Sequence, residues 1–171
     1  MAIKRYYATK DNTITNAFKS NLTIRGVSGN MGQSDILEVF SIYGQVSSST
    51  EGFSSELSRV LIEFDINTIN ADRTSNLIPA SGSVNFFLKM YDAEHTQTTP
   101  KNYELVVQAI SQSWDEGLGL DMEEYRDLDA SNYISASSGV PWAENSGRAT
   151  ALIETVAKEL LTAGTFRLTD A

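Results

Sequence analysis

The stretch SRVLIEFDI, residues 58–66, decides the fold because apolar and polar side chains alternate along it. A period of two residues is typical of a half-buried β-strand, whose successive side chains point to opposite faces of a sheet. We expect the apolar face to be buried and the polar face, with Arg59, Glu63 and Asp65, to point outward. Leu61 is the exception, since it lies among the polar residues. The apolar face consists of Val60, Ile62, Phe64 and Ile66.

Other runs rich in β-branched and aromatic residues repeat this signal, and turn-rich segments separate them. One of these segments, the serine-rich stretch 47–55, is predicted to be a surface loop. Several short strands joined by such loops predict a mainly β fold, an antiparallel β-sandwich of jelly-roll type, rather than alternating strands and helices. The other predicted strands are DNTIT (11–15), NLTIRG (21–26), ILEVFSIYG (36–44), SVNFFLKMY (83–91) and NYELVVQAI (102–110).

The C-terminal end changes to a helical period, which predicts one amphipathic helix over about 147–163, with a short strand at 165–168 in the tail. We expect a single domain over 1–171, with the sandwich spanning about 5–145. The apolar stripe of the helix packs either against the sandwich or against another copy or another protein, and the sequence leaves both open. The candidate interface residues on this stripe are Leu152, Ile153, Val156, Leu160 and Leu161.

Composition excludes several classes of function. The net charge of -9 argues against nucleic-acid binding, which needs clustered lysine and arginine, and against adhesion to anionic membranes. The chain has no cysteine, so it has no disulfides, thiolate metal sites or cysteine nucleophiles. We expect a soluble contact protein without a cofactor.

The acidic stretch SWDEGLGLDMEEYRD, 113–127, is the main chemical candidate. It fails as an EF-hand because Arg126 stands where the loop needs glycine, although a calcium ion held by Asp115 and Asp121 stays open. Glu116 and Asp121 are the carboxylates that a hydrolase would use, but nothing commits the chain to catalysis. We favour a structural interpretation: a glycine turn leading into a short acidic helical turn, with solvent-facing acids and no metal site.

Aromatic residues carry the alternative hypothesis of sugar binding, since an exposed ring can stack on a sugar and a buried ring anchors a core. We expect Trp114 to be a core residue. Trp142 lies in a loop, and the sequence favours neither reading. The candidate stacking platforms for a glycan are Trp142, Tyr133 and Tyr125.

The order of these segments resembles the DNRLRE-type β-sandwich module, which is classed among the carbohydrate-binding modules. The resemblance covers about residues 11–142. The chain is also similar in sequence to structural proteins of marine tailed bacteriophages. The segments that carry this similarity are GNMGQSDILEVFSIYGQ, ELSRVLIEFDI and EGLGLDMEEYRD. The residues that match the module are Arg59, Leu61, Phe64, Asp65, Val84, Phe86, Leu88, Trp114, Glu116 and Trp142.

This resemblance implies a non-catalytic component of the virion, such as a decoration, neck or tail protein. Its expected partners are other virion proteins or further copies of itself, and its contacts would run through the sandwich edges, the loops and the C-terminal helix. The alternative is a carbohydrate-binding module that recognises a host-surface glycan. A hydrolase is the third and least favoured hypothesis.

Overall fold

The computed structural model divides the chain into two compact units, each described here by itself. Unit 1 comprises Met1–Asp65 and Gln112–Thr150, and unit 2 comprises Ile66–Ser111 and Ala151–Ala171. The expectation of one domain over the whole chain stays a prediction. The residues described are 3–49, 52–79, 84–94, 96, 105, 107–108, 110–122, 126–127, 129–143 and the strand 166–169.

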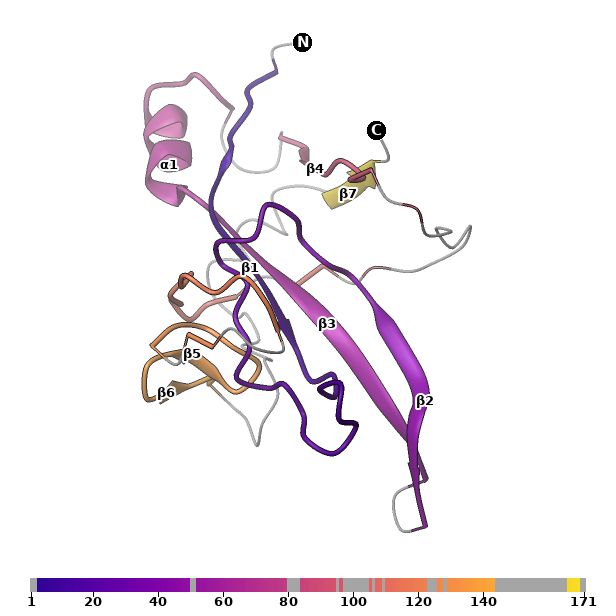
Figure 1. Cartoon of the computed structure of the whole chain (residues 1–171). Coiled ribbons are helices and arrows are strands. Elements are labelled where there is room, and N and C mark those ends of the chain that lie inside the picture. Colours follow the sequence, from indigo (N-terminus) through magenta and orange to yellow (C-terminus); the bar gives the residue numbers. More distant parts are fainter. Residues whose placement is uncertain are drawn as a thin grey trace. The chain divides into compact units, whose positions relative to one another are not determined.

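A three-stranded antiparallel sheet forms the framework of unit 1 (Figure 1). It consists of β1 (Ala8–Thr15), β2 (Ser41–Ser48) and β3 (Gly52–Phe64), in the order β1-β3-β2. A second, small antiparallel pair joins β5 (Ser135–Ser137) to β6 (Val140–Pro141). The mainly β class is therefore confirmed, as is the strand predicted at 11–15. The strand predicted at 58–66 is confirmed as far as Phe64, whereas Ile66 begins a helix.

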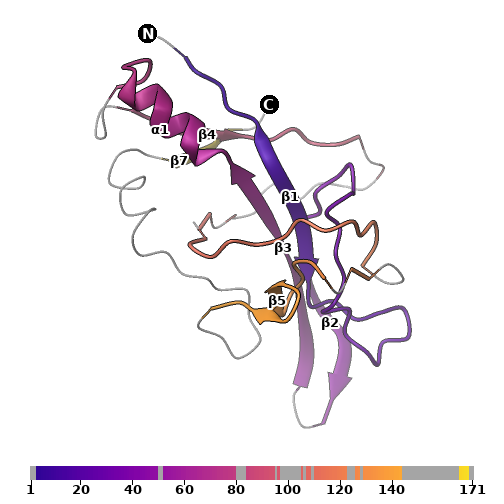
Figure 2. The ribbon, with the colours of Figure 1, turned by 90° about the vertical axis from the view of Figure 1, so that its left-hand side faces the viewer.

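The burial of β3 corrects the predicted faces. Leu61 is only 3% exposed, whereas the predicted core residues Val60, Ile62 and Phe64 are half-buried. In Figure 2 a loop segment from the later part of the chain passes across β1 and β3. Arg59 places its guanidinium 5.1 Å from the ring centroid of Tyr133, so the polar side of this strand meets loops instead of solvent.

Two predicted strands are wrong in part. Residues 21–26 form a tight turn, in which the Lys19 N–H donates to the carbonyl of Ile24 over 2.8 Å and Leu22 has a φ of 53°. The strand predicted at 36–44 begins only at Ser41.

The predicted loop 47–55 belongs largely to the hairpin of β2 and β3. A serine of this segment forms a hydrogen bond across the hairpin, since the N–H of Val46 donates to Ser54 Oγ over 2.9 Å.

Unit 2 contains α1 (Ile66–Thr74), β4 (Phe86–Lys89) and β7 (Phe166–Thr169). β4 and β7 pair in parallel, so the short C-terminal strand is confirmed. The helix α1 was not predicted, although Asp65 directly before it is a residue type that favours helix starts. Asn76, with a φ of 58°, stands just beyond its last turn, as a left-handed helix stop does.

The remaining predictions for unit 2 are only partly covered. In the strand predicted at 102–110, the described residues 105, 107, 108 and 110 lie outside any strand. The predicted helix 147–163, with its five interface residues, lies outside the described residues.

Candidate functional site

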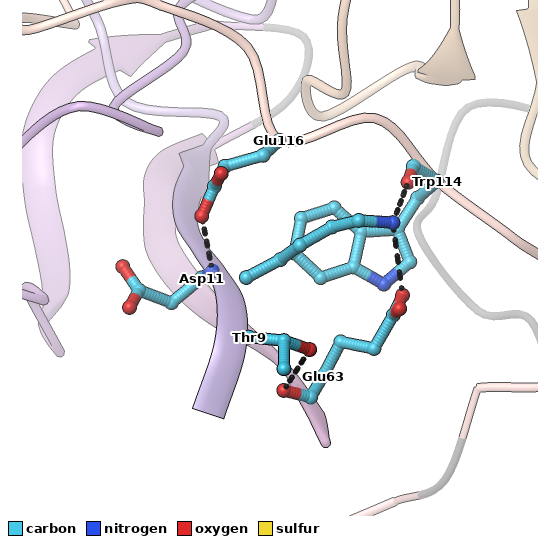
Figure 3. A network of polar contacts seen from close by, with 6 residues as sticks. Thr9, Asp11, Glu63, Trp114 and Glu116 are labelled. Carbon is cyan, nitrogen blue, oxygen red and sulfur yellow. Dashed lines mark hydrogen bonds and ion pairs between the residues drawn. The ribbon is translucent and has the colours of Figure 1, made fainter. Parts of the chain in front are cut away.

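A polar network joins the acidic stretch to β1 and β3 (Figure 3). Lys10 Nζ lies 3.3 Å from Glu63 Oε2 and 3.3 Å from the carbonyl oxygen of Trp114. The same ammonium group lies 5.7 Å from the centroid of the Trp114 ring. Trp114 is 4% exposed, which confirms it as a core residue. Lys10 therefore pins the start of the acidic stretch to the sheet.

Glu116 faces the backbone of β1 rather than solvent, as Figure 3 shows. Its Oε1 accepts a hydrogen bond from the Asp11 N–H over 2.8 Å. Burial raises the pKa of the Asp11 carboxyl above its ordinary value, and the negative charge of Glu116 raises that pKa further. Glu116 therefore satisfies a strand-edge donor, which is a structural use of a carboxylate.

Two acids of the hydrolase and calcium hypotheses lie at the surface of the described part. Asp115 and Asp121 are exposed, and Asp121 forms a backbone bridge with Asn30. No group of three or more histidine or acidic side chains suited to a metal ion occurs among the described residues, which exclude Glu123, Glu124 and His95. Whether calcium binds in 115–129 stays an open prediction.

A buried asparagine, Asn30, holds the acidic stretch against its neighbours. Its Nδ2 donates to the carbonyl oxygens of Glu116 and Ser131, over 2.8 and 2.7 Å. Its Oδ1 accepts from the N–H groups of Gly32 and Gly119, over 3.0 and 2.9 Å. Asn30 is fully buried, and three of these four bonds are buried, whereas the bond to Glu116 is partly buried. One side chain thus fixes three loop segments.

A second buried asparagine ties this junction to the sheet. Asn12, in β1, donates through Nδ2 to Ser131 Oγ over 2.8 Å and accepts at Oδ1 from the Met31 N–H over 2.8 Å. Asn132 is a third asparagine whose side chain binds the backbone, since its Oδ1 accepts from the N–H groups of Ile134 and Ser135. We call Asn12, Asn30, Ser131 and Asn132 the asparagine junction.

Close backbone packing explains the glycines of the acidic stretch. A Cβ atom at Gly119 would meet the backbone carbonyl of Asn30, and one at Gly32 would meet the carbonyl of Glu116. Gly117 has a φ of 84°, and a Cβ there would lie 2.6 Å from the Cβ of Ala130. The sequence pattern predicted a glycine turn, but not that these glycines let the segments touch.

Two of the three candidate residues for glycan stacking are buried. Trp142 is 2% exposed, and its Nε1 donates to the carbonyl of Asn132 over 2.8 Å. Tyr133 is 7% exposed and lies beneath Arg59. Neither ring offers a face to a sugar, because both serve the packing of loops on the sheet. Tyr125 lies outside the described residues.

The described surface has an apolar region that the sequence reasoning missed. Every residue of β2 is exposed except the half-buried Val46. Tyr43 and Phe53 are 74% and 61% exposed, and their ring centroids lie 5.8 Å apart across the hairpin. The sequence signal that could have indicated this surface is that β2 contains no charged residue. We call Ser41–Ser48 with Gly52–Ser55 the hairpin surface.

Comparison with known proteins gives no match to a family model, a curated protein or a solved structure. The resemblance noted from the sequence therefore stays a prediction. Within the described part of the chain, no helix has the length and apolar character that crossing a membrane requires.

Proposed function

We propose that this chain is a non-catalytic structural protein that acts by contact with other proteins. Following the resemblance, we place it in the virion of a tailed bacteriophage, as a decoration, neck or tail component. The antiparallel β-sandwich of jelly-roll type is part of this proposal. So is the use of the C-terminal stripe as an interface.

The observation that carries the proposal is the exposed apolar surface around the hairpin. Large apolar side chains that gather on a surface mark contact sites more often than single exposed ones do. Aromatic residues are favoured at such contacts because they combine a large area with few rotatable bonds. The exposed apolar residues between positions 36 and 53 are Ile36, Val39, Ile42, Tyr43 and Phe53, at 39–74% exposure.

The use of the acidic side chains also supports this proposal. Glu116 binds a strand N–H and Glu63 pairs with Lys10, so both carboxylates have structural partners. A reaction that uses two carboxylates needs both of them to face a substrate. The sugar-binding alternative draws no support from Trp142 or Tyr133, because both rings are buried.

Detection in purified particles tests the proposal directly. An antibody raised against the purified chain would be used on density-purified particles of the phage that encodes it, with a non-virion enzyme of the same phage as control. We expect the chain in the particles at several copies each, and the control only in the cell lysate. Finding the chain only in the lysate would overturn the proposal.

A further inference from the structure

The outer edge of β2 carries backbone groups that no strand among the described residues pairs with. The Ser58 N–H donates to the carbonyl of Phe40 over 3.0 Å, and the Val46 N–H donates to Ser54 Oγ. Phe40 and Val46 therefore face β3. Because backbone groups alternate in direction along a strand, the next residues face away from it. The N–H and C=O groups that face away include those of Ser41, Tyr43 and Ser47; the register shifts between Tyr43 and Ser47, where Gly44 has a φ of 76°.

The two edges of this sheet differ. At β1, Glu116 accepts from the Asp11 N–H, and Thr13 Oγ1 accepts from the Glu38 N–H, so segments of the chain cover that strand. At β2, no strand of the described part pairs with the outer side. Proteins commonly protect an exposed edge with lysine or proline, and β2 contains neither. Its sequence is that of a strand open to pairing.

Charge decides what kind of strand fits this edge. Residues 26–58 contain four carboxylates and no lysine or arginine; of these, Glu56 is fully buried and Glu51 lies outside the described residues. Asp35 and Glu38, which lie before β2 in the chain, are exposed. A second copy would bring like charges together, since each chain carries a net charge of -9. A segment with basic residues at its ends would meet opposite charge instead.

We propose that the outer edge of β2 accepts an extended segment of a different protein as an additional β-strand. Main-chain hydrogen bonds to β2 supply the binding, and apolar side chains of the added strand cover Tyr43 and Phe53. Lysine or arginine residues flank the apolar part and are attracted by the net charge of -9 that this chain carries. The inference deepens the proposed function and rests on it, because it names the kind of partner that the contact surface takes.

Defined peptides test this pairing. The probe is a fluorescent ten-residue peptide of alternating valine and threonine with two lysines at each end. The controls have glutamates at the ends, or a proline in place of a central valine. We expect the lysine peptide to bind and to slow hydrogen exchange at β2, and its affinity to fall with added salt. Both controls should bind more weakly.

Proline variants of the edge provide the matched test on the protein. Ser41→Pro and Ser47→Pro each remove one outward N–H, and proline is tolerated on an edge strand where the N–H faces solvent. Together they should weaken peptide binding about tenfold, the loss expected for two net hydrogen bonds. Ser41→Ala with Ser47→Ala should bind like the unchanged protein. Equal unfolding midpoints for the three proteins would show that the fold is retained.

The outcomes separate this inference from the proposed function. If the chain is found in particles but binds both charged peptides equally, or not at all, the added-strand inference is wrong and the structural role stands. Concentration-dependent self-association that protects β2 would overturn it in favour of a second copy. If the lysine peptide protects β2 but the chain is absent from particles, the edge inference holds and the virion role fails.

Discussion

The asparagine junction and the hairpin surface, both in unit 1, reverse the usual placement of polar and apolar side chains. The junction buries asparagines and a serine, each satisfied by hydrogen bonds, where a core would ordinarily hold aliphatic residues. The hairpin surface exposes Tyr43 and Phe53 where a soluble protein would ordinarily place polar residues. The two regions therefore have different roles: the asparagine junction holds the loops in place, and the hairpin surface is available for contact with a partner.

The largest effect should come from removing the central side chain of the junction. Asn30→Ala deletes four hydrogen bonds and leaves the carbonyls of Glu116 and Ser131 and the N–H groups of Gly32 and Gly119 without this partner. The Ser131 carbonyl still accepts from Asn12 Nδ2, so three groups lose their bond without replacement. Because each buried group left unsatisfied costs about 1–3 kcal/mol, we expect a loss of at least about 3 kcal/mol in the free energy of unfolding. Urea denaturation followed by tryptophan fluorescence measures it.

The matched control is an asparagine with a similar local role on the surface. Asn21 accepts at Oδ1 from the N–H groups of Thr23 and Ile24, but it is exposed, so water can replace these bonds. Asn21→Ala should cost less than about 1 kcal/mol. If the two variants lost equal stability, burial of the junction would not be its source of strength.

A smaller loss should follow from adding one methyl group at the contact between two segments. Gly119→Ala places its Cβ against the backbone carbonyl of Asn30, which cannot move aside as a flexible side chain could. Overpacking of this kind costs about 1–3 kcal/mol. Gly139→Ala is the control, because its Cβ would meet nothing within 4 Å and only the φ of 66° opposes it. A greater loss at Gly139 would contradict the steric explanation.

Sequence reasoning found the β class but not the way in which unit 1 is held together. Alternation in 58–66 predicted the strand, because periodicity depends only on neighbouring residues. It misjudged Leu61, which is buried although it lies among polar residues. Loops that lie far away in the sequence meet this part of the sheet, where Arg59 contacts Tyr133 and Lys10 contacts Trp114. Nothing local marks Asn30 as buried, because asparagine is more common in exposed turns.

For the candidate sites, too, the local sequence did not predict which side chains are buried. Trp142 and Tyr133 were candidate stacking platforms, but both rings are buried in the folded chain. The hairpin surface was missed for the opposite reason, since the apolar run 36–44 is typical of a core strand. A sequence pattern gives the side-chain period, whereas tertiary packing decides which face is covered.

A smaller effect, which depends on pH, should appear where the junction meets β1. The folded protein binds the Asp11 proton more tightly than the unfolded chain does, because burial and the charge of Glu116 raise its pKa. This contribution to stability is therefore fully present below the ordinary pKa of 3.8 and is lost as the pH rises through the higher folded value. Asp11→Asn should raise the melting temperature at pH 7, and the difference should shrink in acid.

Thermal unfolding across this pH range measures the effect of Asp11→Asn. Asp35→Asn removes one exposed carboxylate and serves as the charge-matched control, with little change expected. A lower melting temperature for Asp11→Asn at pH 7 would mean that the ionised Asp11 side chain is stabilising, contrary to the direction of its pKa.

The smallest change in stability should come from the most conspicuous apolar pair. Replacing both Tyr43 and Phe53 by serine removes one cross-strand aromatic contact, worth at most about 1 kcal/mol at an exposed position. The midpoint of urea unfolding should barely move, whereas binding of the lysine-ended peptide should be lost. Trp142→Ala, which removes a buried ring, should do the reverse and cost about 3–5 kcal/mol. If the double serine variant unfolded as readily as Trp142→Ala, the hairpin would belong to the core, and the contrast between a locked junction and an open contact strand would fail.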